Sequence, residues 1–158
     1  MKLRLARNKD GKQIINLIRK CYQDYPNCYL DVENDSPELK YVYSYFRKNN
    51  GKFWVYEKNN KIIGCMGILP GRERNLEIHR LYINKKYRRR GLAKKLLTIA
   101  ENYALKSKIK KITLWTDTRF KASHKTYKKF NYKKLKRTRK LYDISNTTEY
   151  RFEKKLVS

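Results

Sequence analysis

The stretch "EIHRLYINKKYRRRGLAKKLL", residues 77–97, decides the fold. It starts with the alternating pattern of a strand and ends with apolar residues at helical spacing. Between them lies a turn in which Arg88, Arg89 and Arg90 precede Gly91. The start of a helix already carries partial positive charge and unpaired N–H groups, so each exposed cation there costs about 0.3–1 kcal/mol. A strongly anionic ligand bound at the glycine turn accounts for this concentration of charge.

The strand before this turn changes its apolar phase halfway along. Leu76 and Ile78 alternate, but position 80 is Arg80, and the apolar phase resumes at Leu81 and Ile83. Because side chains in a strand alternate strictly between faces, the slip requires one extra residue, a β-bulge near Arg80. A bulge would splay this strand from its neighbour and admit a ligand. The alternative is an edge strand with one exposed arginine.

Composition bounds the class of protein. The chain has 158 residues, of which 40% are hydrophobic, and this favours one folded domain over residues 1–158. No apolar run reaches the roughly 18 residues of a membrane span, and residues 1–10 lack a signal peptide's apolar stretch. We therefore expect a cytoplasmic protein with no membrane partner. Cys21, Cys28 and Cys65 form no CxxC motif, so reduced thiols are favoured over disulfides or a metal site.

The positive charge is extreme and unevenly distributed. Lysine and arginine number 41 against 14 acidic residues, for a formal net charge of +27. Residues 1–70 hold 13 basic and 7 acidic residues, whereas residues 71–158 hold 28 and 7. One interpretation is a polyanionic partner, either nucleic acid or a phosphorylated cofactor. The other is an AT-rich genome that enriches Lys, Asn and Ile, although this does not explain the focus on residues 88–90.

Periodicity and turn signals predict the remaining elements. The predicted helices are one capped by Asp10, one opened by Ser36-Pro37 and running to about residue 47, and those at 91–107 and 122–130. Their inner faces carry Ile14, Ile15, Ile18, Cys21 and Tyr22 in the first helix and Leu92, Leu96, Ile99, Ala100 and Tyr103 in the third. The predicted strands are 3–7, a hairpin over 53–69 that turns at Asn59-Asn60, 76–83, 111–116, 132–142 and 149–156. This order predicts a mixed sheet with helices on its faces.

Three segments resemble one family. Residues 88–93, Arg-Arg-Arg-Gly-Leu-Ala, match the (Q/R)-x-x-G-x-(G/A) signature of the GNAT superfamily of acyl-CoA-dependent N-acetyltransferases. The stretch "TDTRFKASHKTYKKFNY", residues 116–132, resembles the family's fifth strand and fourth helix, and "FWVYEKNNKIIGCMGIL" resembles its second and third strands. The resemblance covers residues 3–156. Neither GxxxxGK(S/T) nor GxGxxG occurs, so a P-loop and a dinucleotide fingerprint are excluded.

The resemblance implies a single α/β domain with a mixed, mostly antiparallel twisted sheet, helices on both faces and a splayed, bulged fourth strand. It also implies acetyl-CoA as cosubstrate and no metal. The diphosphate would lie on the N–H groups of the turn, and the pantetheine arm would pair with the fourth strand. The implied cofactor-binding residues are Leu81, Tyr82, Ile83, Arg88, Arg89, Arg90, Gly91, Leu92, Ala93 and Lys94.

The transfer requires a base and an acid. An amine attacks a thioester only when neutral, and a lysine-like amine is neutral in about one molecule in 2,500 at pH 7. The resemblance implies Glu77 as base, with His79 as a weaker candidate and a surface ion pair as the alternative for Glu77. It implies that Tyr127 protonates the leaving thiolate, helped by a nearby cation such as Lys125 or Lys128. The alternative is a tyrosine that only packs.

Two departures from the family pattern stand out. Phe120 replaces an asparagine that often contacts the pantetheine, and Asn131-Tyr132 replaces Gly-Phe. Asparagine tolerates positive φ best among non-glycine residues, so we expect that turn to survive.

The acceptor is an amine of a small molecule or peptide, and its identity is not encoded in any motif. Five acidic residues between the first two helices predict an acidic lip that favours a cationic acceptor, with a solvated loop as the alternative: Asp24, Asp31, Glu33, Asp35 and Glu38. We expect a monomer or homodimer. Two further functions stay open, a basic nucleic-acid-binding module and an acyl-CoA-binding protein without turnover.

Overall fold

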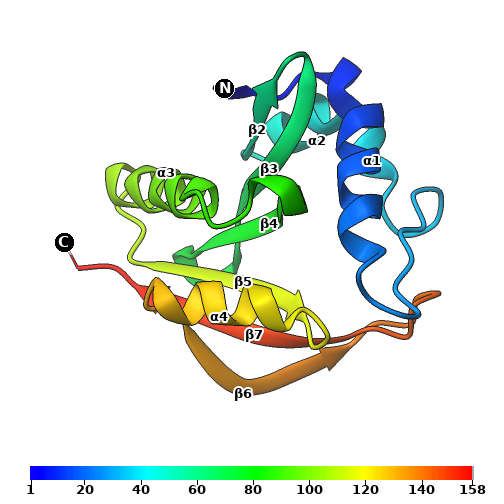
Figure 1. Cartoon of the computed structure of the whole chain (residues 1–158). Coiled ribbons are helices and arrows are strands. Elements are labelled where there is room, and N and C mark those ends of the chain that lie inside the picture. Colours follow the sequence, from blue (N-terminus) through cyan, green and yellow to red (C-terminus); the bar gives the residue numbers. More distant parts are fainter. Residues whose placement is uncertain (158) are drawn as a thin grey trace.

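A seven-stranded sheet organises the chain, in a computed structural model that describes residues 1–157 (Figure 1). The strand order is β1-β2-β3-β4-β5-β7-β6, and only β4 and β5 run parallel. The strands are β1 (Lys2–Leu5), β2 (Lys52–Lys58), β3 (Lys61–Pro70), β4 (Leu76–Ile83), β5 (Lys111–Asp117), β6 (Lys133–Lys140) and β7 (Thr148–Lys155). The predicted α/β fold with a mixed, mostly antiparallel sheet is confirmed.

Helices cover both faces of this sheet. On one face, α1 (Gly11–Tyr22) and α2 (Val42–Lys48) pack on β2 and β3, and on the other α3 (Leu92–Lys106) and α4 (Lys121–Lys129) pack on the central and C-terminal strands. Four short 3-10 turns complete the chain: η1 (Asn8–Asp10), η2 (Pro37–Tyr41), η3 (Arg72–Arg74) and η4 (Lys85–Tyr87). The element order matches the one predicted from periodicity.

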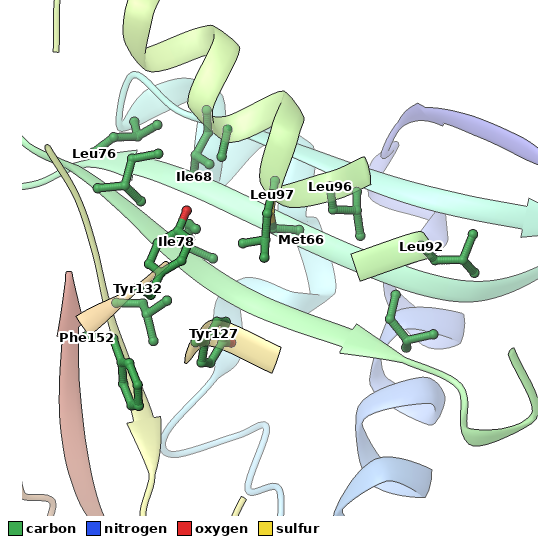
Figure 2. Packing of buried hydrophobic residues seen from close by; sticks show 14 of the residues in the cluster. Met66, Ile68, Leu76, Ile78, Leu92, Leu96, Leu97, Tyr127, Tyr132 and Phe152 are labelled. Atoms are coloured by element: carbon green, nitrogen blue, oxygen red, sulfur yellow. The ribbon is translucent and has the colours of Figure 1, made fainter. Parts of the chain in front are cut away.

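The larger of the two cores lies under α3. Figure 2 shows Leu92, Leu96 and Leu97 of α3 against Met66 of β3 and Ile78 of β4, with Tyr127, Tyr132 and Phe152 completing the cluster. The predicted inner face of α3 is confirmed at Leu92, Leu96 and Ala100, whereas Ile99 and Tyr103 are only partly buried. The second core joins α1 and α2 to β2 and β3, and all three cysteines are buried and free.

The two predicted N-cap residues stand at the predicted positions, but neither side chain makes a capping hydrogen bond. The Asp10 carboxylate does not cap α1; it accepts from the Arg7 backbone N–H at 2.7 Å and pairs with the Arg4 guanidinium at 2.8 Å. Ser36 precedes Pro37 at the N-cap of the 3-10 turn η2, but its hydroxyl accepts from Arg80 at 2.6 Å. An arginine binds each side chain: Arg4 is six residues from Asp10, whereas Arg80 is 44 residues from Ser36 and could not be predicted from local spacing.

The asparagine turns form as predicted. Asn59 and Asn60 have φ of 51° and 61° at the tip of the β2–β3 hairpin. Asn131 has a φ of 69°, so the turn after α4 survives without glycine.

The predicted bulge lies at Arg80. Its φ is +56°, and the β3–β4 register jumps between the pairs Gly67–His79 and Cys65–Tyr82. The extra residue places Leu81 and Ile83 on the face of α3 and leaves Tyr82 on the face of α1. Pairing with β5 covers only residues 76–78 of β4. The second half of β4 therefore diverges from β5, which confirms the splayed strand.

Candidate active site

The turn between β4 and α3 presents a row of unused N–H groups. Gly91, at φ +79°, and Arg89, at φ +63°, both have left-handed backbones, and the first helical bond runs from the Lys95 N–H to the Gly91 carbonyl at 3.1 Å. Within residues 1–157, the N–H groups of residues 89–94 donate to no protein acceptor. Such a row of N–H groups at a helix N-terminus forms a cradle for an anion.

The three arginines of the turn have different surroundings. Arg88 is directed back to β4, where its Nε donates to the Ile83 carbonyl at 2.9 Å, and its guanidinium lies 3.9 Å from Asp24. Arg90 lies over the Tyr87 ring, 5.3 Å from its centroid. Arg89 is exposed and forms no ion pair within the described residues. Arg89 is therefore the side chain most available to an incoming anion.

The outer edge of β4 is open beside this turn. The Asn84 N–H donates to Ile63 of β3 at 2.8 Å, so by alternation the backbone groups of Leu81 and Ile83 face away from β3. The Ile83 carbonyl confirms this direction, because it accepts from Arg88 and from the Cys21 thiol. β5 pairs with neither residue. An extended amide-containing ligand can add here as a strand does.

A cleft of about 270 Å³ begins at this open edge. Both residues predicted to be catalytic, Glu77 of β4 and Tyr127 of α4, line it, as do Leu81 and Tyr82. Its outer wall is the loop after α1, docked on the β6–β7 loop by two bonds between the Tyr29 backbone and the Ser145 hydroxyl, at 2.7 and 3.0 Å.

Arg119 ties the same walls to the end of β5. Its guanidinium binds the Asp117 carboxylate at 2.7 and 2.9 Å and donates to the carbonyls of Asn27 and Ser145 at 3.0 and 3.2 Å. One cation thus joins three segments that are distant in sequence, and the cleft has a fixed outer wall.

Glu77 and His79 lie side by side on the cleft face of β4. Glu77 Oε1 is 3.4 Å from His79 Nε2, and Glu77 Oε2 is 3.3 Å from the guanidinium of Arg151. Burial lowers the pKa of His79 and outweighs the opposing effect of the Glu77 charge. The imidazole is therefore neutral at pH 7. The Glu77 carboxylate lies between this imidazole and the guanidinium of Arg151.

Tyr127 lies in an apolar environment. Its ring packs on Tyr132 and Phe152, with centroids 6.0 and 5.5 Å away. Burial alone raises the pKa of Tyr127. The expected help from Lys125 or Lys128 is wrong, because both side chains are exposed and neither contributes to this shift. The phenol is therefore a proton donor that stays protonated at neutral pH.

Phe120 occupies the position of the family's asparagine and joins an aromatic cluster. Its ring lies 4.8 Å from Tyr25 and 5.6 Å from Tyr22 between centroids. The Tyr22 hydroxyl lies 3.2 Å from that of Tyr82. An apolar wall therefore stands at this side of the cleft in place of an amide.

Acidic residues are concentrated in the cleft. Seven of the chain's 14 acidic residues line it, but no lysine does, although the chain carries 41 basic residues. Three of the five residues of the predicted acidic lip line the cleft: Asp31, Asp35 and Glu38. The other two, Asp24 and Glu33, do not line it and pair with cations elsewhere. Sequence reasoning missed the other lining carboxylates besides Glu77, which are Asp117, Asp143 and Glu149.

Three of these carboxylates lack a cationic partner in residues 1–157. Glu38 pairs with Arg80 at 3.1 Å and Glu149 with Arg139 at 2.6 Å, but Asp31, Asp35 and Asp143 form no ion pair. Desolvation, together with the charges of Asp31 and Asp143, raises the pKa of Asp35. This mutual repulsion leaves a negative rim that a cation would relieve.

Residues 1–157 contain neither a cluster of metal ligands nor a membrane-spanning helix. No group of three or more His, Cys, Asp or Glu side chains there is arranged to hold a metal ion. No described helix is both long enough and apolar enough to cross a membrane.

Comparison with known proteins identifies relatives of this chain. Residues 12–132 match the family model described as acetyltransferase (GNAT) family. "Probable N-acetyltransferase 14" from Xenopus tropicalis is 34% identical over 101 residues, which are 62% of this chain and 48% of that protein. The chain thus spans about half the length of the curated relatives it matches.

Solved structures share the fold over almost the whole chain. An acetyltransferase of the GNAT family from Staphylococcus aureus Mu50 superposes with a TM-score of 0.85 at 20% identity, covering 99% of both chains. The protein yncA from Salmonella typhimurium, solved with its cofactor acetyl-CoA, superposes with a TM-score of 0.74 at 14% identity, covering 99% of this chain and 94% of that one.

Proposed function

The chain belongs to the acetyltransferase (GNAT) family, and we propose that it transfers the acetyl group of acetyl-CoA to a primary amine by direct attack. One observation carries this proposal. A single cleft joins the open edge of β4, next to the arginine turn, to Glu77 and Tyr127. The β4 edge proposed for the pantetheine arm, the proposed base and the proposed acid therefore line one space, and the arginine turn follows that edge in the chain.

The residues present fit acetyl-CoA. The unused N–H groups of residues 89–94 and the exposed Arg89 match a diphosphate. The open backbone groups of Leu81 and Ile83 match the amides of a pantetheine arm. When bound, acetyl-CoA supplies an acetyl group activated as a thioester. The remaining cofactor-binding residues proposed are Tyr82, Arg88, Arg90, Gly91, Leu92, Ala93 and Lys94.

Glu77 acts as the base. It takes the proton that the acceptor's ammonium group releases, directly or through a water molecule, and the neutral nitrogen then attacks the thioester carbon. His79, neutral and adjacent, is a second acceptor for the same proton. Both side chains face the cleft, so the proton leaves on the acceptor side.

Tyr127 acts as the acid. As the carbon–nitrogen bond forms and the carbon–sulfur bond breaks, Tyr127 gives its phenolic proton to the leaving sulfur. The new amide nitrogen releases its surplus proton to water, and the phenolate regains a proton from the solvent. Reference pKa values make this transfer uphill by about 1.5 units in water, but the desolvation that disfavours a phenolate in this cleft also disfavours a thiolate.

Transfer is direct because the one cysteine in the cleft is a poor nucleophile. Cys28 lines the cleft, and burial raises its pKa to about 11. The thiolate is the reactive form of cysteine, and it is scarce at neutral pH under these conditions. No acetylated cysteine intermediate is therefore proposed.

The acceptor proposed is a cationic amine. Asp31, Asp35 and Asp143 surround the outer cleft without cationic partners in the described chain, and no lysine lines the cleft. An ammonium group that approaches this rim reduces the repulsion between the carboxylates and enters next to Glu77.

The basic strand β6 favours a second function. Six of its eight residues are lysine or arginine, and only Arg139 has a carboxylate partner. Such a strand can bind nucleic acid, although lysines on an edge strand also prevent association between sheets.

One assay separates the functions. The purified chain is incubated with acetyl-CoA and a panel of amines, polyamines, peptides and aminoglycosides, and free CoA is measured. Amine-dependent release of CoA supports the transferase. CoA binding in a calorimeter without release by any amine supports a binding protein, and salt-sensitive RNA binding with neither result supports the nucleic-acid module.

A further inference from the structure

Arg151 of β7 reaches across a neighbouring strand to the proposed base. Its guanidinium lies 3.3 Å from Glu77 Oε2, although β5 separates β7 from β4 in the sheet. Its side chain is 12% exposed, so little water competes for this contact. Glu77 has one other close partner, His79, at its other oxygen.

The ring of Trp115 supports Arg151 along this path. Trp115 of β5 and Arg151 of β7 are directly opposed in register, and the guanidinium lies 4.8 Å from the ring centroid. A planar guanidinium over an indole is held by cation–π attraction and by stacking. The arginine can therefore adopt few orientations, and the one observed meets Glu77.

The charges around Glu77 come from several elements. Arg151 contacts Glu77 without lining the cleft itself. The charged and titratable side chains that line the cleft near Glu77 are His79 and Arg80 on β4, Glu38 on η2, Arg139 on β6 and Glu149 on β7. Arg80 pairs with Glu38 and Arg139 with Glu149. Of the three arginines near Glu77, Arg151 is therefore the one that pairs with it.

We infer that Arg151 is the positioning residue of the proposed base: held over Trp115, it keeps the Glu77 carboxylate directed between the cleft and His79. This inference rests on the proposed function. One carboxylate oxygen of Glu77 lies 3.3 Å from the guanidinium of Arg151, and the other lies 3.4 Å from His79. The contact with the held guanidinium limits rotation of the carboxylate, so its lone pairs keep one direction.

The test compares three variants. Arg151→Met removes the charge but keeps an unbranched chain over Trp115, Arg151→Lys keeps the charge and loses the planar fork, and Arg137→Met is the matched control. Arg137 lies over the same ring, at 5.6 Å, and like Arg151 it does not line the cleft, but it has no carboxylate partner within residues 1–157. For each protein kcat/KM is measured from about pH 5.5 to about pH 9, together with the CoA Kd and the Tm.

In Arg151→Met kcat/KM should fall about tenfold across this pH range, because the Glu77 carboxylate is no longer held in one direction. The CoA Kd should stay within twofold of the wild-type value. Arg151→Lys should restore part of kcat/KM, and Arg137→Met should follow the wild type. An Arg151→Met protein with the wild-type kcat/KM overturns the inference.

A second readout does not need activity. The chain has only two histidines, so the titration of each imidazole can be followed by NMR. Arg151→Met should move the His79 titration to higher pH, because Glu77 then interacts with His79 alone, while His124 stays unchanged. An unmoved His79 overturns the inference even in an inactive protein. A moved His79 together with no CoA release from the wild type contradicts the proposed function and leaves the positioning of Glu77 supported.

Discussion

Arg88 Nε donates to the carbonyl oxygen of Ile83 at 2.9 Å, and this bond fixes the end of β4 to the turn that follows it. The same guanidinium is 3.6 Å from the Cys21 sulfur and 3.9 Å from Asp24, so it also fixes α1. Three adjacent arginines are therefore not equivalent. The first stabilises the shape of the turn, and Arg89 is left to attract an anion.

Replacing Arg89 with alanine tests this division. We expect the CoA Kd to rise about three- to fivefold in low salt, the size of an exposed ion pair. The loss should disappear near 1 M salt, where the screening length is about 3 Å. Calorimetric titrations at several salt concentrations measure it. Lys136→Ala, which removes an exposed cation on β6, is the control for net charge alone, and an equal effect of both variants would contradict the assignment.

Gly91 allows a second test of anion binding at the turn, because a side chain at this position would contact no other residue in the absence of ligand. A Cβ at this position has no protein atom within 4 Å, but the φ of +79° strains most residues. Gly91→Val should lower the free energy of unfolding by about 1–2 kcal/mol. Gly91→Asn tolerates this backbone but covers the N–H row, so its CoA affinity should fall at least about tenfold with little change in Tm. If Gly91→Asn binds CoA with wild-type affinity, the proposal that the diphosphate binds at this turn is contradicted.

Local pattern was enough to predict the strand bulge and the helix mouth. The phase slip between Ile78 and Leu81 predicts a β-bulge, and the bulge appears at Arg80. The asparagine turns follow equally from backbone sterics. Each of these features depends on residues within one strand or one turn.

Contacts between distant segments could not be predicted in the same way. The bond between Tyr29 and Ser145 joins residues 116 positions apart, and it brings Asp143 into the cleft. Arg151 reaches Glu77 only because β7 inserts between β5 and β6 in the sheet. In a chain with 41 basic residues, the sequence does not indicate which cation meets which carboxylate.

Tyr127→Phe separates catalysis from packing. The ring stays buried, so acetyl-CoA binding should change less than twofold, whereas kcat should fall about a hundredfold if the phenol is the acid. Tyr132→Phe is a matched control, because Tyr132 is also buried, burial is the first cause of its raised pKa, and it does not line the cleft. Wild-type kcat in Tyr127→Phe across pH would make Tyr127 a packing residue.

The same pair of variants makes a prediction for stability in alkali. Burial raises the pKa of Tyr127 in the folded state, so the folded chain holds this proton more tightly than the unfolded chain. The associated stability is present below about pH 10, the unfolded value, and is lost as the pH rises above it. Both Tyr127→Phe and Tyr132→Phe should therefore lose less stability than the wild type above about pH 10, as measured by urea denaturation. Equal pH dependence in wild type and variants would contradict the burial of these phenols.

The acidic rim predicts how the acceptor is chosen. Replacing Asp31 and Asp35 with asparagine should raise the KM of a cationic acceptor about three- to tenfold and leave the KM of acetyl-CoA unchanged, because only the acceptor meets these carboxylates. Glu33→Gln is the matched control: Glu33 lies in the same loop, pairs with Lys40 and does not line the cleft. Steady-state kinetics with each substrate varied in turn measures both constants. The effect should shrink with added salt, since exposed charges are screened over about 8–10 Å in moderate salt. Glu33→Gln should not raise the acceptor KM as much as the double variant does if the prediction is right. An equal increase would mean that the negative charge of the whole loop attracts the amine, and it would contradict a specific role for Asp31 and Asp35.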